Sequence, residues 1–148
     1  MHTYSPLPDA VAHIQGGRDA PALSGEVKFY QDPEMVLVVA DMAGLPQTGG
    51  SGFFALHIHE GNSCTGDQFS DTGGHYDPTG APHPGHAGDL PPLLSCGGIA
   101  HLSVLSDRFS VEDIIGRTVV IHSGPDDFHS QPAGNAGTKI ACGVIRRV

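Results

Sequence analysis

The chain has 148 residues, which is enough for one domain with a hydrophobic core of its own. Its formal net charge is −9 with only seven Lys and Arg, so a nucleic-acid-binding protein is not expected. No apolar run approaches the roughly 18 residues of a membrane-spanning helix, so membrane association is not expected either. The first ten residues, MHTYSPLPDA, lack the basic start and the apolar stretch of a signal peptide. We therefore expect a cytoplasmic protein as the chain is written, or the mature form of an exported one.

The pattern of apolar residues predicts a series of short β-strands. Residues 1–9 are expected to form a disordered lead, and residues 10–148 a single domain. Strands are predicted at 10–15, 24–31, 35–42, 53–60, 99–105, 116–122 and 139–145. A single helical turn capped by Ser110 is predicted at 110–115. With 21 Gly and 12 Pro between them, many short strands are typical of an all-β sandwich or barrel.

No regular element is predicted between residues 61 and 98. A loop of this length is uncommon in a compact domain unless metal ligands or a disulfide hold it in place. Four side chains in it have the spacing His75-x7-His83-x2-His86-x2-Asp89. Three imidazoles and one carboxylate are a donor set that suits tetrahedral Zn²⁺. The alternative is an adventitious metal trap in a loop rich in Gly and Pro.

Two further histidines, His57 and His59, lie two residues apart in the predicted strand 53–60. Residues with this spacing point to the same face of a strand, so the pair could bind one metal or simply cover a solvent-exposed face. His122 ends the predicted strand 116–122. Together with the loop histidines, these residues provide more imidazole than one metal needs. Two adjacent metals are therefore the simplest interpretation.

Four segments of the chain resemble the copper/zinc superoxide dismutase family, in its order and with nearly its spacing. They are FALHIHEGNSC, GGHYDPTGAPHPGHAGDLP, IIGRTVVIHS and GNAGTKIACGVI, which all lie between residue 53 and the C-terminus. The resemblance implies an eight-stranded antiparallel Greek-key β-barrel or immunoglobulin-like sandwich, with two long loops that build the site. It also implies an antioxidant enzyme with one copper and one zinc per chain, which converts superoxide to dioxygen and hydrogen peroxide.

The resemblance assigns a role to each candidate ligand. It implies copper ligands at His57, His59, His75 and His122, and zinc ligands at His75, His83, His86 and Asp89. His75 would bridge the two metals and carry a proton during catalysis. Asp126 would accept hydrogen bonds from the copper ligand His57 and the zinc ligand His83, and so fix the orientation of both rings.

The three cysteines also receive roles from the resemblance. Cys64 and Cys142 are expected to form an intrachain disulfide between the long loop and the last strand, although two buried thiols are the ordinary alternative. The third, Cys96, is expected to be a free surface thiol. The disulfide would not by itself require export, because cytosolic members of the family keep theirs.

Lys139 is the clearest departure from the family pattern, which has Arg at this position beside the copper. Lysine keeps the positive charge but lacks the planar fork that can hold an anion through two parallel hydrogen bonds. We expect Lys139 to attract the substrate anion and to dock it less well than Arg. The alternative is a solvated lysine near the start of a strand. The loop 122–138 has few charges beyond Asp126 and Asp127, so attraction near the copper would rest on Lys139 and the metal.

The departure at Lys139 leaves a second hypothesis open, a non-catalytic relative that binds zinc or copper. The complete set of expected ligands argues against it.

Four other histidines are expected to be inert, although the last could approach the copper: His2, His13, His101 and His129. The sequence leaves both a monomer and a homodimer open.

Overall fold

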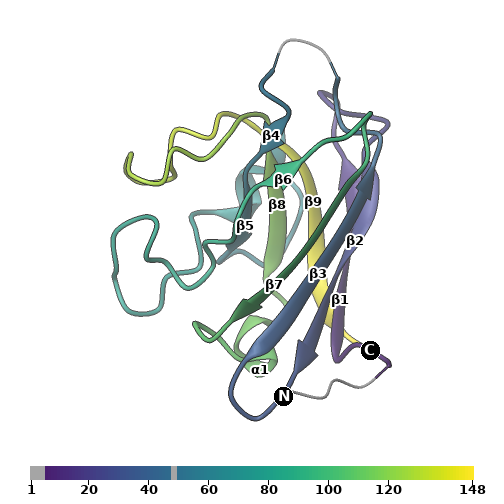
Figure 1. Cartoon of the computed structure of the whole chain (residues 1–148). Coiled ribbons are helices and arrows are strands. Elements are labelled where there is room, and N and C mark those ends of the chain that lie inside the picture. Colours follow the sequence, from purple (N-terminus) through teal and green to yellow (C-terminus); the bar gives the residue numbers. More distant parts are fainter. Residues whose placement is uncertain (1–5, 48–49) are drawn as a thin grey trace.

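The computed structural model describes residues 6–47 and 50–148, and its regular elements are almost all β-strands (Figure 1). The strands are β1 (Ala10–Gly16), β2 (Ser24–Gln31), β3 (Val36–Ala43), β4 (Phe53–Phe54), β5 (Leu56–His59), β6 (Leu93–Leu94), β7 (Ala100–Ser106), β8 (Thr118–His122) and β9 (Lys139–Arg147). Helical structure in these residues is limited to a 3₁₀ segment, Asp67–Thr72, and to one α-helical turn, α1 (Val111–Ile114). No helix in the described residues is long and apolar enough to cross a membrane.

The strands form a curled antiparallel sheet with the order β5-β8-β9-β1-β2-β3-β7. A second, two-stranded sheet pairs β4 with β6. Because β4 runs into β5 and β6 packs beside β7, this short sheet lies between the two ends of the long one. Some neighbouring strands, such as β3 and β7, are distant in sequence, so the chain must cross over between them, as it does in a Greek-key barrel.

The predicted strands are present, and the count of eight is recovered when β4 and β5 are taken together. The predicted strand 53–60 divides at Ala55, where the chain leaves β6 and joins β8. The Ala55 amide donates to Gly124 O (2.9 Å), and the His122 amide donates to Ala55 O (2.9 Å). The predicted loop 61–98 contains two short elements that the sequence pattern did not indicate, the 3₁₀ segment and β6.

Local sequence explains the other elements. In β1 and β3 buried residues alternate with more exposed ones, as expected for strands with one face on the core. The helical turn α1 begins at the predicted cap: Ser110 Oγ accepts from the Asp113 amide (3.3 Å), and the Asp113 carboxylate accepts from the Ser110 amide (3.0 Å). Asp9, within the predicted lead, accepts a hydrogen bond from the Gln31 amide (2.8 Å).

Strands β5 and β8 differ from the rest because every residue in them is buried. Leu56 and Ile58 of β5 face the hydrophobic core, so His57 and His59 face outward. Outward-facing residues are buried here because the loops 60–92 and 123–138 lie on the same side of the barrel, beside β5 and β8 (Figure 1). The fold thus creates an enclosed polar layer between one face of the sheet and two long loops.

A disulfide fixes the first of these loops to the sheet. Cys64 and Cys142 are bonded, with their Cα atoms 5.8 Å apart, which confirms the expected pairing. The bridge closes a loop of 78 residues and, in the chain-entropy model, stabilises the fold by about 4–5 kcal/mol. Cys96 is free and exposed, as expected.

Candidate metal centre

Three segments meet at Ile58, the residue between His57 and His59. The Tyr76 amide donates to Ile58 O (2.8 Å), the Ile58 amide to Gly88 O (2.8 Å), and the Gly88 amide to Tyr76 O (2.9 Å). This closed set of backbone bonds brings the residues beside Tyr76 and Gly88, which are His75 and Asp89, next to the outward face of β5. Residues that are far apart in the chain therefore share one site.

Four of the expected ligands form one tight group. A ring nitrogen from each lies within 4.8 Å of the other three, and the members are His57, His59, His75 and His122. Within this group, His59 Nε2 and His122 Nε2 are 3.2 Å apart. All four side chains are buried. Four converging imidazole nitrogens form a site that suits copper.

The expected zinc ligands surround the carboxylate of Asp89. Its Oδ1 lies 2.8 Å from His75 Nδ1, and its Oδ2 lies 3.0 Å from His83 Nδ1 and 3.2 Å from His86 Nδ1. The Nδ1 atoms of His75 and His86 are 3.1 Å apart. A tetrahedral zinc with bonds of 2.0–2.1 Å places its ligand atoms about 3.3 Å from each other, so the set is close to that geometry. A ring nitrogen of His57 also lies within 4.8 Å of the ligand atoms of His75, His83 and Asp89.

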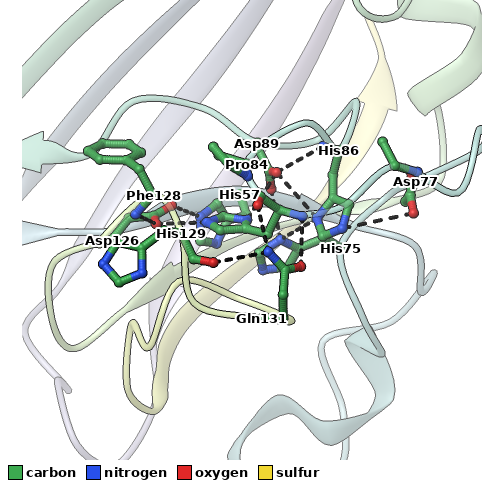
Figure 2. A network of polar contacts seen from close by, with 12 residues as sticks. His57, His75, Asp77, Pro84, His86, Asp89, Asp126, Phe128, His129 and Gln131 are labelled. Carbon is green, nitrogen blue, oxygen red and sulfur yellow. Dashed lines mark hydrogen bonds and ion pairs between the residues drawn. The ribbon is translucent and has the colours of Figure 1, made fainter.

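The carboxylate of Asp126 connects the two groups, because it contacts one histidine of each. Its Oδ2 is 2.8 Å from His57 Nε2, and its Oδ1 is 2.7 Å from His83 Nε2 (Figure 2). A buried carboxylate that accepts from both Nε2 atoms leaves the lone pair of each Nδ1 free and directed into the cluster. The contacts predicted for Asp126 are therefore present in the structure.

Several buried nitrogens in this cluster make no hydrogen bond within the part of the chain that the structure describes. Among the described residues, His57 Nδ1, His75 Nε2 and His83 Nδ1 are buried without a hydrogen bond. An unpaired buried polar atom costs about 1–3 kcal/mol, and native structures contain few of them. Three such atoms on converging rings are what a metal site requires. The residues present therefore fit two bound metal ions.

Burial keeps the rings in the form that binds metal. Together with the charges of neighbouring rings, burial lowers the pKa of His57 and of His59 to about 2 and that of His122 to about 4. Burial alone would raise the pKa of Asp89, but the hydrogen bond from His75 and the charges of the surrounding rings outweigh it, so that pKa is lowered. Neutral imidazoles and an ionised carboxylate are the ligand forms of these residues.

Lys139 lies at the edge of the four-histidine group. It pairs with His122 across β8 and β9, and its Nζ donates to Thr72 Oγ1 (2.7 Å) and to Gly73 O (2.9 Å). The same carbonyl, Gly73 O, lies 2.9 Å from His59 Nδ1. An ammonium group has three N–H donors, so these two bonds leave one for another acceptor.

The remaining histidines lie outside the two groups. His13 is near Glu26 (4.0 Å), and His101 contacts Asp41 (2.6 Å) on the exposed face of the sheet. His129 is an exposed neighbour of Asp127 (3.7 Å). His2 lies outside the described residues.

Two glycines are needed at the site, although no sequence pattern distinguishes them from the other glycines. A Cβ on Gly88 would lie 2.2 Å from Ile58 O, so the loop can approach β5 only with glycine at this position. Gly134 has φ +73°, and a Cβ there would lie 2.0 Å from Asp126 Oδ1. Only the three-dimensional contact shows the requirement, because glycine is common throughout this chain.

Comparison with known proteins gives a consistent result. Residues 23–145 match the family model described as copper/zinc superoxide dismutase. The chain is 35% identical to superoxide dismutase [Cu-Zn] 2 of Aquifex aeolicus, over 93% of this chain and 88% of that protein. It is 36% identical to superoxide dismutase [Cu-Zn] of Legionella pneumophila, over 93% and 87%. It is also 34% identical to the copper chaperone for superoxide dismutase of Mus musculus, over 93% of this chain but 53% of that protein.

The family name states two metals, and the structure offers two groups of side chains that could hold them. The barrel, the disulfide and the two ligand groups agree with the match over most of the chain. The chain therefore belongs to the copper/zinc superoxide dismutase family.

Proposed function

We propose that this protein is a superoxide dismutase, which converts superoxide to dioxygen and hydrogen peroxide. Copper would be held by His57, His59, His75 and His122, and zinc by His75, His83, His86 and Asp89. The observation that carries the proposal is that the two groups adjoin and share the rings of His57 and His75. Asp126 already contacts His57 Nε2, which leaves His57 a single nitrogen, so His75 is the ring that we assign to both metals. The Nδ1 of His75 contacts Asp89, while its buried Nε2 has no hydrogen-bond partner among the described residues, and we assign that second nitrogen to copper.

The bound copper would supply the one-electron redox chemistry, with a nitrogen ligand set suited to it. His75 can carry a proton at Nε2 whenever that atom is not a ligand, because its Nδ1 remains fixed beside Asp89. Asp126 and Asp89 keep the surrounding rings in place during such a transfer. A proton held at this atom lies next to the position where a reduced oxygen species would need it.

Lys139 would provide the positive charge that attracts the substrate. The whole chain carries a formal charge of −9, which repels an anion, so a local cation beside the site matters. Two of its N–H groups are used by Thr72 and Gly73, and we assign the third to the incoming anion. One donor attracts an anion but orients it less strictly than a guanidinium would.

A second candidate function is metal binding without useful turnover. It is favoured by the partly engaged ammonium of Lys139 and by the 34% identity to the copper chaperone for superoxide dismutase of Mus musculus. Identity does not separate the two candidates, because the value for the Aquifex aeolicus dismutase is 35%. The complete four-histidine group favours the dismutase.

The test is metal analysis of the purified protein after reconstitution with both metals, together with a superoxide-consumption assay. A dismutase should contain one copper and one zinc per chain and show activity that azide inhibits. Zinc alone, without activity after copper has been supplied, would contradict the proposal and favour the non-catalytic candidate.

A further inference from the structure

The loop that carries the expected zinc ligands, residues 83–89, is held by two side chains that belong to no metal-binding motif. We propose that Gln131 and Arg108 are positioning residues, which clamp the backbone of this loop and set the rate at which zinc leaves. The inference rests on the zinc assignment made under the proposed function. Its basis is a set of hydrogen bonds to backbone atoms of the loop.

Gln131 binds both backbone groups of one ligand residue. Its amide oxygen accepts from the His83 amide (2.9 Å), and its amide nitrogen donates to His83 O (2.7 Å). The same nitrogen also donates to His129 O (3.1 Å), which ties the carboxamide to its own loop (Figure 2). Because Asp126 takes His83 Nε2, the loop 123–138 fixes His83 at three points and leaves only Nδ1 for the metal.

Arg108 holds the next part of the loop. It lies between β7 and α1, and its Nη1 donates to Pro84 O (2.8 Å) and to His86 O (3.2 Å). One guanidinium therefore spans the turn that separates the ligands His83 and His86. Hydrogen bonds from a charged donor are stronger than those between neutral groups. Two separate parts of the chain, the loop 123–138 and the residues between β7 and α1, thus hold the same short segment.

These bonds matter because the segment has no helix or strand of its own. Before zinc can leave, at least one imidazole must turn away, and this requires local opening of the backbone that carries it. The clamp opposes that opening. Outer partners of metal ligands typically contribute 10–100-fold to metal affinity, and we expect an effect of that size here.

The experiment measures zinc release from the protein loaded with copper and zinc, by means of a chromogenic zinc chelator. Gln131→Met and Arg108→Met keep much of the side-chain length but remove the hydrogen bonds, and each should release zinc about 10–100 times faster than the parent. The matched controls are Gln15→Met, at an exposed position of β1, and Arg147→Met, whose guanidinium pairs with Glu112 (3.1 Å). Both controls should release zinc at the parental rate.

Two conservative variants separate a positioning role from a general loss of structure. Arg108→Lys keeps the charge and can reach one carbonyl, and Gln131→Glu keeps the acceptor for the His83 amide but loses the donor. Both should show intermediate rates, with the copper absorption band unchanged. Parental rates in all four variants would overturn the clamp while the zinc assignment stands. A parent protein that retains no zinc would instead refute the assignment, and the clamp with it.

Discussion

Each imidazole of the cluster has two nitrogens, and a hydrogen bond to one of them leaves the other free to bind a metal. Asp126 occupies the Nε2 atoms of His57 and His83, and the carbonyl of Gly73 occupies the Nδ1 of His59. His75 differs, because its Nδ1 contacts Asp89 while its buried Nε2 has no hydrogen-bond partner among the described residues. At the level of single residues, the site is therefore a set of fixed tautomers around one ring that is shared.

His122→Ala should remove dismutase activity and leave zinc in place. His122 provides a nitrogen to the four-histidine group but none to the set around Asp89. The variant should therefore retain one zinc per chain and lose copper binding, which metal analysis and the superoxide assay would measure. His101→Ala, on the exposed face of the sheet, is the control. Full activity in the His122 variant would contradict the copper assignment.

Lys139→Arg should increase both activity and the affinity for azide. A guanidinium offers five N–H donors, so it can bind Thr72 and Gly73 and still present two parallel donors to an anion. Stronger docking would appear as a lower azide dissociation constant in a spectroscopic titration of the copper-loaded protein. Lys28→Arg, which keeps a charge beside Glu26 on β2, should change neither value. Unchanged azide affinity in the Lys139 variant would show that this side chain does not face the anion.

At the scale of elements, strand β5 is the support on which both ligand groups are assembled. Its residues alternate between core and site, and the backbone of Ile58 forms hydrogen bonds with both neighbouring ligand segments. A rigid strand thus positions ligands that come from irregular loops. This arrangement explains how a long segment with little regular structure becomes ordered.

Gly88→Ala should separate the zinc-binding loop from β5. The added methyl group would lie 2.2 Å from Ile58 O, and backbone atoms can relieve that contact only by moving apart. We expect a loss of stability of about 1–3 kcal/mol and much weaker zinc binding, measured by urea unfolding and by competition with a zinc chelator. Gly50→Ala is the control, because no atom of the described residues, apart from its chain neighbours, lies within 4 Å of its added Cβ. Zinc affinity equal to that of the parent would mean that the loop does not depend on this contact.

The elements that sequence predicts well are those with a repeating pattern. The alternation of apolar and polar residues predicted strands such as β2 and β3, and the spacing of Ser110 and Asp113 predicted the helical turn. The two-residue strand β6 was missed, because two residues cannot show a period. For the site, spacing and resemblance supplied every expected ligand. Gln131, Arg108 and Gly88 were not predicted, since their roles depend on backbone atoms of distant segments, which leave no pattern near the residue itself.

At the scale of the whole molecule, the barrel and its loops bury a cluster of imidazole rings, and this burial strongly disfavours their protonation. His57, His59 and His122 are neutral in the folded protein, because burial lowers their pKa to about 2, 2 and 4. In an unfolded chain the pKa of a histidine is about 6.5. Below that pH the unfolded state therefore binds more protons than the folded state, and the free energy of unfolding must fall as the pH falls.

The metal-free protein should consequently lose stability in acid. Between pH 6 and pH 4, each of the three histidines lowers the free energy of unfolding by up to about 1.4 kcal/mol per pH unit. This contribution is complete above about pH 6.5 and disappears as the pH falls toward the folded values. Urea unfolding of metal-free protein at several pH values measures the slope. His122→Gln should reduce it, whereas His13→Gln, at an exposed residue of β1, should not. A metal-free protein equally stable at pH 7 and pH 5 would show that the buried rings are already protonated or exposed, and that the cluster is not preformed before metal binds.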